Sequence, residues 1–114
     1  MSLSVEQFLS LSDAEQLQTI KDLNDIGQEE IIIDVLTDAG IDNLSVPLLG
    51  ELGRAYNNND KPEEAVKVFK TIDKEHRDAV WHYRCAYSHG SIASTNHEAY
   101  TSENMQQMLA LVDN

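Results

Sequence analysis

Apolar residues recur at three- and four-residue intervals through the middle of the chain. Leu48, Leu52 and Ala55 share one face of a segment for which Asn43 or Ser45 is the predicted cap. A second segment follows a polar turn, with four apolar residues on one side: Ala65, Val68, Phe69 and Ile72. This is the spacing of an amphipathic helix, whereas a half-buried strand would alternate. The pattern predicts two amphipathic helices joined by a short turn.

The residues between these helices carry signals that end one helix and start the next. Asparagine tolerates left-handed backbone and competes for backbone hydrogen bonds, so residues 57–59 are predicted to end the first helix. Asp60 is the predicted N-cap of the second helix, with Glu63 in the capping-box position. Pro62 fits the first turn, where backbone N–H groups lack intrahelical partners.

Three helices are predicted before this pair. Ser12 and Glu15 form a capping-box pattern that opens a helix ending at Gly27. A short helix over residues 5–10 precedes it. A helix over residues 28–39 follows, and its middle is apolar nearly all round. Such a helix usually packs between neighbours rather than lying on the surface.

Two further helices are predicted after the pair. The first covers residues 79–89, and small residues over 90–94 are predicted to form a loop. Thr95 and Glu98 form another capping-box pattern, which opens a last helix over residues 96–112. The chain is therefore predicted to be all-α.

The central pair of helices resembles the tetratricopeptide repeat (TPR). Seven residues match that family's pattern in register: Leu49, Leu52, Gly53, Ala55, Tyr56, Ala65 and Phe69. The departures are Asp60, Pro62 and Arg77, where a glycine, an aromatic residue and a proline are usual. A degraded second copy follows, with Cys85 and Ala86 in place of its Leu-Gly pair.

The resemblance implies a short right-handed α-solenoid of antiparallel helical hairpins. No Gly- or Pro-rich linker divides the chain, so residues 1–114 are expected to form one TPR-like domain. Within it, residues 1–45 would be acidic N-terminal helices, residues 46–78 the best repeat, and residues 79–114 a degenerate repeat or a cap.

The resemblance also implies a binding surface, because proteins of this family hold a peptide or partner helix in a concave groove. The groove is lined by the first helix of each pair, which places five residues of this chain in it: Arg54, Asn57, Asn58, Tyr83 and Tyr87. In the alternative, the tyrosines only pack on neighbouring helices and the asparagines only end one. Gly50 stands where the chaperone-binding subfamily carries a lysine, so chaperone binding is not supported.

The net charge of −12 is concentrated at the N-terminus, since residues 1–45 hold ten acidic residues and one basic residue. This acidity argues against nucleic acid and anionic membranes as partners and allows a basic protein partner. A solubilising surface would also explain it. With one cysteine, no signal peptide and no membrane-length apolar run, we expect a cytoplasmic protein.

The chain contains no recognisable catalytic motif, and we expect a non-catalytic protein without cofactors. His82, Cys85 and His89 lie near one helical face, and imidazole and thiolate are zinc ligands, with His97 or Glu98 as a fourth candidate. Their alternative role is packing. Three hypotheses stay open: an interaction module, which we favour, a zinc-binding domain, and a subunit or fragment of a larger repeat protein. Homo-oligomerisation stays open with them.

Overall fold

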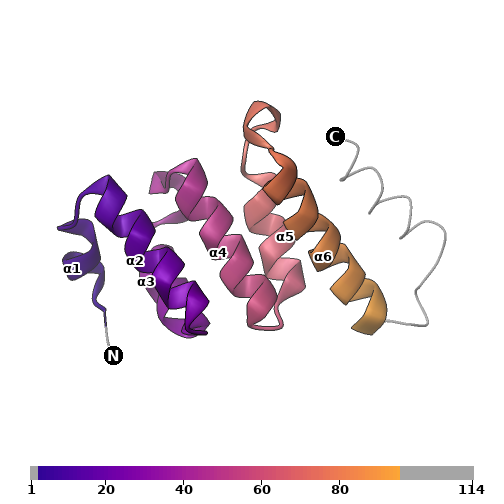
Figure 1. Ribbon diagram of the computed structural model, residues 1–114, viewed down its shortest axis with the longest axis horizontal. Helices are drawn as coiled ribbons and strands as arrows, with labels where there is room; N and C mark the ends of the chain where they lie inside the picture. The colour runs from indigo at the N-terminus through magenta and orange to yellow at the C-terminus, as the bar shows by residue number, and fades with distance from the viewer. Residues whose placement is uncertain (1–2, 96–114) are drawn as a thin grey trace.

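The computed structural model describes residues 3–95, and its regular structure there is entirely helical (Figure 1). The prediction of an all-α chain is confirmed for these residues, which contain no β-strand. The elements are α1 (Val5–Leu9), α2 (Asp13–Asp25), α3 (Glu29–Ala39), α4 (Val46–Asn58), α5 (Pro62–Lys70) and α6 (Ala79–Thr95), with short 3-10 turns η1 (Ile41–Asn43) and η2 (Lys74–His76).

The helices alternate between two layers. Helices α2, α4 and α6 run in the same direction and lie side by side, with α4 in contact with both others (Figure 1). Helices α3 and α5 run back in the opposite direction, so that α3 packs on α2 and α4, and α5 packs on α4 and α6. Because α3 and α5 each reverse the direction of the chain, α2, α4 and α6 lie in one layer and share one outer face.

The core is formed by the apolar faces that the helical spacing predicts. Every helix contributes fully buried side chains to it. The largest apolar ones are Phe8, Ile20, Ile32, Leu36, Leu52 and Phe69, and α6 contributes Cys85. Burying one large apolar side chain stabilises a fold by about 1.5–3 kcal/mol. These contacts fix the two layers against each other and so position the surface described below.

Gly53 allows α4 and α5 to approach closely. A Cβ atom at this position would overlap the ring of Phe69, which is fully buried. The glycine therefore provides the space that the aromatic ring fills, as its place on the apolar face of α4 predicts. Any larger residue would push the two helices apart.

The predicted start signals of α2 and α4 are confirmed. The Ser12 hydroxyl accepts from the Glu15 N–H at 3.2 Å, and the Glu15 carboxylate accepts from the Ser12 N–H at 3.1 Å. The backbone hydrogen bond from Ser12 lowers the pKa of the Glu15 carboxyl. Ser45, one of two candidates, caps α4. Gly27 adopts a positive φ of 75° just after α2, as expected for a residue that ends a helix.

The prediction of Asp60 as N-cap is wrong. Asp60 has a φ of 60°, which is left-handed backbone that short polar residues tolerate better than most. It lies in the turn itself, where the Lys61 N–H donates to the carbonyl of Tyr56 at 2.9 Å and closes the end of α4. Lys61 is then the residue before α5, and no side chain caps this helix.

The predicted loop over residues 90–94 is also wrong, because α6 continues through it to Thr95. Alanine and serine are compatible with a helix, and a single glycine at position 90 costs only about 1 kcal/mol relative to alanine. Thr95 is consequently the last residue of α6. The predicted helix over residues 96–112 lies outside the described residues.

Candidate functional site

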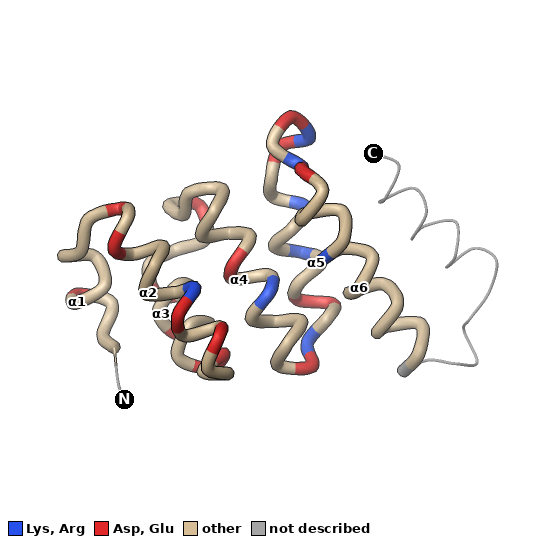
Figure 2. The backbone as a smooth tube through the Cα atoms, in the orientation of Figure 1, with Lys and Arg blue, Asp and Glu red and all other residues tan. Residues whose placement is uncertain are grey.

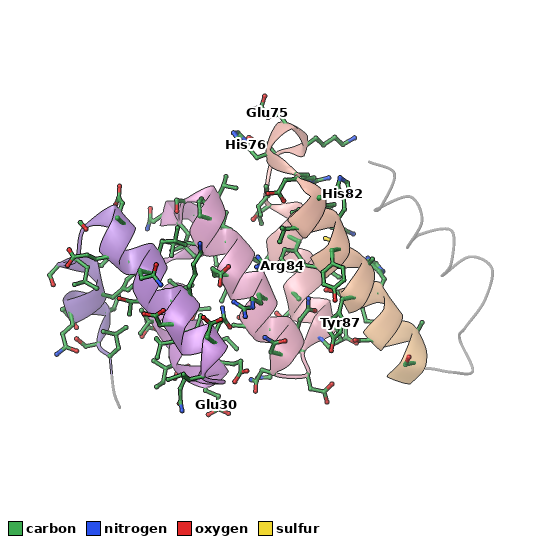
Figure 3. All side chains as sticks on the ribbon, viewed as in Figure 1. Glu30, Glu75, His76, His82, Arg84 and Tyr87 are labelled. Atoms are coloured by element: carbon green, nitrogen blue, oxygen red, sulfur yellow. The ribbon has the colours of Figure 1, made fainter. Side chains whose placement is uncertain are left out.

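The five residues assigned to a groove from the sequence come together on the common face of α4 and α6. They line one surface hollow of about 330 Å³, together with two residues that the sequence analysis did not assign, Val80 and Arg84. Arg54, Asn57 and Asn58 come from α4, and Tyr83 and Tyr87 come from α6. Arg84 and Tyr87 are labelled in Figure 3, where both lie on α6.

An apolar and aromatic stripe forms the α6 side of this hollow. Val80, Tyr83 and Tyr87 are spaced by three and four residues, which places them on one face of the helix. Val80 is 50% exposed, Tyr83 73% and Tyr87 50%. The two tyrosines therefore do not pack into the core. They offer ring faces and hydroxyl groups to the solvent, as residues at protein interfaces often do.

Asn57 holds α4 and α6 together and is not free to bind a ligand. Its Nδ2 donates to the carbonyl of Arg84 at 3.1 Å, and its Oδ1 accepts from the Ser88 hydroxyl at 2.6 Å. Asn57 and Ser88 are both buried, so these bonds are shielded from water. Asn58, its neighbour, is exposed. Of the two asparagines, Asn58 is therefore the one available for contacts.

A buried carboxylate organises the arginines below the hollow. Glu51 is only 5% exposed, and its Oε1 accepts from Arg54 Nη1 at 3.2 Å while its Oε2 accepts from Arg84 Nη2 at 3.1 Å. Asn24, on α2, donates its Nδ2 to the same carboxylate at 3.1 Å. Arg54 reaches further to Asp25, with 3.2 Å between Nη2 and Oδ1. This network joins α2, α4 and α6 directly beneath their common face.

Gly50 makes room for Arg84. A Cβ atom at Gly50 would lie 3.2 Å from Arg84 Nη1, which is a tight contact. The same Nη1 donates to the Gly50 carbonyl at 3.0 Å. The absence of a side chain at position 50, where the chaperone-binding subfamily carries a lysine, therefore leaves room for the Arg84 side chain from α6.

A second hollow continues the first along the common face. It measures about 410 Å³ and adjoins the first hollow at Val80 and Arg84, which line both. The two adjoining hollows, with lining residues from α2, α4 and α6, are together called the trough. Apolar residues dominate its lining, and Lys21 and Asp78 add one charge of each sign. The apolar members are Leu17, Val46, Pro47, Phe69, Ile72 and Trp81.

Trp81 fixes α6 at the edge of this trough. Its indole Nε1 donates to the carbonyl of Phe69 on α5 at 2.9 Å, and the guanidinium of Arg77 lies 4.5 Å from its ring centre. Asp78 caps α6 by accepting from the Trp81 N–H at 2.8 Å. The stripe of Val80, Tyr83 and Tyr87 is therefore carried by a helix that is anchored to both layers.

The structure does not gather His82, Cys85 and His89 into a metal site. Cys85 is fully buried, and burial raises the pKa of its thiol to about 12, which disfavours the thiolate that zinc requires. His82 packs edge-on against the ring of Trp81, with 4.9 Å between ring centres. Burial lowers the pKa of His89. The further candidates His97 and Glu98 lie outside the described residues.

Another set of possible ligands lies at η2 and the residue before it. Within residues 3–95, three or more ligand atoms of histidine, cysteine or acidic residues approach within 4.8 Å of one another only at Asp73, Glu75 and His76. Glu75 and His76 are labelled in Figure 3, at the turn that precedes α6. All three side chains are exposed, and such surface clusters are common without a metal.

Comparison with known proteins does not assign the chain to a family. No family model matches it, and no curated protein or solved structure does. None of the helices formed by residues 3–95 is long and apolar enough to cross a membrane.

The sequence analysis missed the residues beneath the trough. Val80 and Arg84 lie three residues before Tyr83 and Tyr87, respectively, so helical spacing from the tyrosines would have found both. Glu51 would have followed from Arg54 in the same way. Asp25 and Lys21 carried no such signal, because their nearness to the trough depends on how α2 packs against α4.

Proposed function

We propose that this protein is a non-catalytic interaction module that binds a peptide or a partner helix in the trough across α2, α4 and α6. The proposal includes a short right-handed solenoid of TPR-like hairpins as its architecture. The alternation of helices between two layers supports this architecture, because it leaves one layer's outer face unpartnered.

The observation that carries the proposal is the exposed stripe on α6. Val80, Tyr83 and Tyr87 face solvent beside a hollow whose opposite wall offers the Arg54 guanidinium and the Asn58 amide. Large apolar and aromatic side chains exposed together commonly mark an interaction site. Tyrosine adds contact area with few rotatable bonds, and asparagine can both donate to and accept from a peptide backbone.

A selection experiment tests the proposal directly. The full chain is immobilised, a random peptide library displayed on phage is selected against it, and recovered peptides are measured by fluorescence anisotropy. We expect binding to the Tyr83→Ser/Tyr87→Ser double variant to be at least about tenfold weaker, as for aromatic residues at the centre of an interface. Both side chains are exposed, so the fold should survive, which circular dichroism checks.

Leu9→Ser is the matched control. Leu9 is an exposed large apolar residue on α1 and lines neither hollow of the trough, so its replacement removes exposed apolar surface without touching the site. Peptide binding should be unchanged in this variant. Binding that survives in the double tyrosine variant, or that is lost equally in Leu9→Ser, would count against the trough as the binding site.

A further inference from the structure

The arginines in the trough carry little uncompensated positive charge. Arg54 is paired with Glu51 and Asp25, and Arg84 is paired with Glu51. These two guanidinium groups and two carboxylates cancel formally. A ligand carboxylate that binds either arginine would have to displace an existing ion pair. Two of the three ion pairs are with Glu51, which is buried. Lys21 and Asp78 add one further charge of each sign to the lining, so the charges of the site balance and give it no net preference for an acidic ligand.

The α6 wall instead offers contacts suited to apolar and cationic groups. Val80, Tyr83 and Tyr87 present apolar surface to solvent, and Arg84 is the only charged residue of this helix. Figure 2 shows α6 almost without acidic or basic positions along its described length. An aliphatic or aromatic side chain can be buried on this wall, and tyrosine ring faces also attract lysine and arginine.

On the α2 side, Lys21 of the lining and the nearby Asp25 carry opposite charges, whereas the N-terminal part of the chain around them is acidic. Asp25 is 65% exposed despite its pairing with Arg54. It belongs to the N-terminal part of the chain, residues 1–45, in which nine acidic residues are not balanced by bases. Figure 2 shows acidic positions on α1, α2 and α3. A field of this sign attracts cationic ligands and repels anionic ones.

We infer that the trough selects a peptide segment with an aliphatic or aromatic anchor flanked by lysine or arginine. The anchor lies on Val80, Tyr83 and Tyr87, and the basic flank lies toward Asp25 on α2. This inference rests on the proposed function and adds the chemistry of the ligand to it. It follows from charge complementarity together with the exposed apolar stripe.

Four synthetic probe peptides of equal length test this inference. Three share a central leucine and phenylalanine and differ in their flanks, which are lysine, glutamate or serine; the fourth has lysine flanks and no apolar anchor. Binding to the full chain is followed by amide chemical shifts in NMR at low and at high salt. We expect the anchored lysine peptide to bind about tenfold more tightly than the anchored glutamate peptide at low salt, with the difference shrinking as salt is added.

Two variants with the same change in net charge locate the effect. Asp25→Asn removes the acid that pairs with Arg54 of the trough and leaves that guanidinium less compensated, so the preference for lysine over glutamate flanks should fall severalfold. Asp38→Asn removes an exposed acid on α3, outside the residues that line the trough, and should leave the preference close to that of the wild type. Equal effects of both variants would overturn a local role for Asp25.

The remaining outcomes separate the inference from the proposed function. The inferred chemistry is wrong if the anchored glutamate peptide, or the lysine peptide without an anchor, binds as tightly as the anchored lysine peptide. In either case the trough stays a binding site. If neither these probes nor any library-selected peptide shifts the amides of α4 and α6, the proposed function is wrong. Sedimentation that depends on concentration and is abolished by Tyr83→Ser would identify a second copy as the occupant. Shifts of residues 96–114 caused by Tyr87→Ser without peptide would identify the chain's own C-terminal segment; either result overturns the inference.

Discussion

The carboxylate of Glu51 on α4 binds the guanidinium of Arg84 on α6 with 3.1 Å between Oε2 and Nη2. The two residues are 33 positions apart. Arg84 also donates to the carbonyl of Gly50, the residue directly before Glu51 in α4. This pair sets the distance between the two helices whose side chains line the hollow. The buried carboxylate of Glu51 therefore helps to position the side chains of α4 and α6 that line the hollow.

Replacing Glu51 with glutamine should destabilise the fold clearly. Glutamine fills the same space but leaves Arg84 and Arg54 without their shared negative partner. Hydrogen bonds to charged groups contribute about 1.5–3 kcal/mol, and we expect a loss of about 2 kcal/mol in the free energy of unfolding, since both arginines keep some contact with water. Urea denaturation followed by circular dichroism measures it.

Glu64→Gln is the control for that measurement. Glu64 pairs with Lys67 at 3.4 Å, and both side chains are largely in solvent. A pair of this kind contributes about 0–1 kcal/mol, so the midpoint of unfolding should hardly move. Equal losses in the free energy of unfolding in the two variants would mean that the buried ion pairs of Glu51 stabilise the fold no more than an exposed pair does.

The two neighbouring asparagines of α4 should behave differently. Asn57→Ala removes the bonds to Ser88 and to the Arg84 carbonyl and should cost about 1–3 kcal/mol in unfolding free energy. Asn58→Ala changes an exposed side chain and should alter stability by less than about 0.5 kcal/mol. In the anisotropy assay only Asn58→Ala should weaken peptide binding without a change in stability. A larger loss of stability in Asn58→Ala than in Asn57→Ala would contradict the roles inferred from burial.

Gly53 and Gly90 offer a second matched pair. Alanine at position 53 would overlap the ring of Phe69, and overpacking of this kind costs about 1–3 kcal/mol. Alanine at position 90 lies inside α6 and meets no atom of the described residues within 4 Å, so it should stabilise the fold by about 0.5–1 kcal/mol. The two changes should move the urea midpoint in opposite directions. Destabilisation by both would show that space at Gly53 is not what the fold requires.

The local parts of this fold are readable from the sequence because they depend on short-range rules. Helical spacing identifies the core residues Leu52 and Phe69, and serine three residues before glutamate identifies the start of α2. Asp60 misled the analysis because the same side chain suits an N-cap and a left-handed turn. The small residues after His89 misled it because they permit a loop without requiring one.

The candidate site was readable only in part. The resemblance to the TPR pattern assigned Arg54, Asn58, Tyr83 and Tyr87 to one groove. The structure brings them to one hollow, while their role in binding stays a prediction. The burial of Asn57 and Glu51 was not readable, because a polar residue on a helix is normally assigned to the surface. Their burial depends on where α6 packs against α4, which involves residues about 30 positions away.

Cys85 should be unreactive in the folded protein. Burial raises the pKa of its thiol to about 12 from an ordinary value near 9, so almost no thiolate exists at pH 8. Iodoacetamide should label Cys85 rapidly in urea. Without urea, labelling should be slow, because only molecules that transiently unfold expose the thiol. Stability contributed by the protonated thiol should be present at pH 8 and be lost as the pH rises from about 9 toward 12. Rapid labelling of the native protein at pH 8, or protection by added zinc, would contradict this prediction.

His89 should make the fold less stable in mild acid. Burial, and secondarily the positive charge of Lys70, lower the pKa of this imidazole in the folded state below its ordinary value of 6.5. Its Nε2 is buried and has no hydrogen-bond partner among the described residues, so a proton there would be poorly solvated. The unfolded chain therefore binds this proton more readily, and stability that is present above pH 6.5 is lost as the pH falls through the folded pKa.

The size of that loss is limited by a single proton. One titrating group changes the free energy of unfolding by at most about 1.4 kcal/mol per pH unit. His89→Gln should remove this contribution, so the fall in stability between neutral and mildly acidic pH should be smaller than in the wild type. Urea denaturation at several pH values measures the difference, and the ring resonances of His89 report its titration in the folded protein. A titration of His89 at or above pH 6.5 would show that burial does not control this group, because desolvation can only disfavour its charged form.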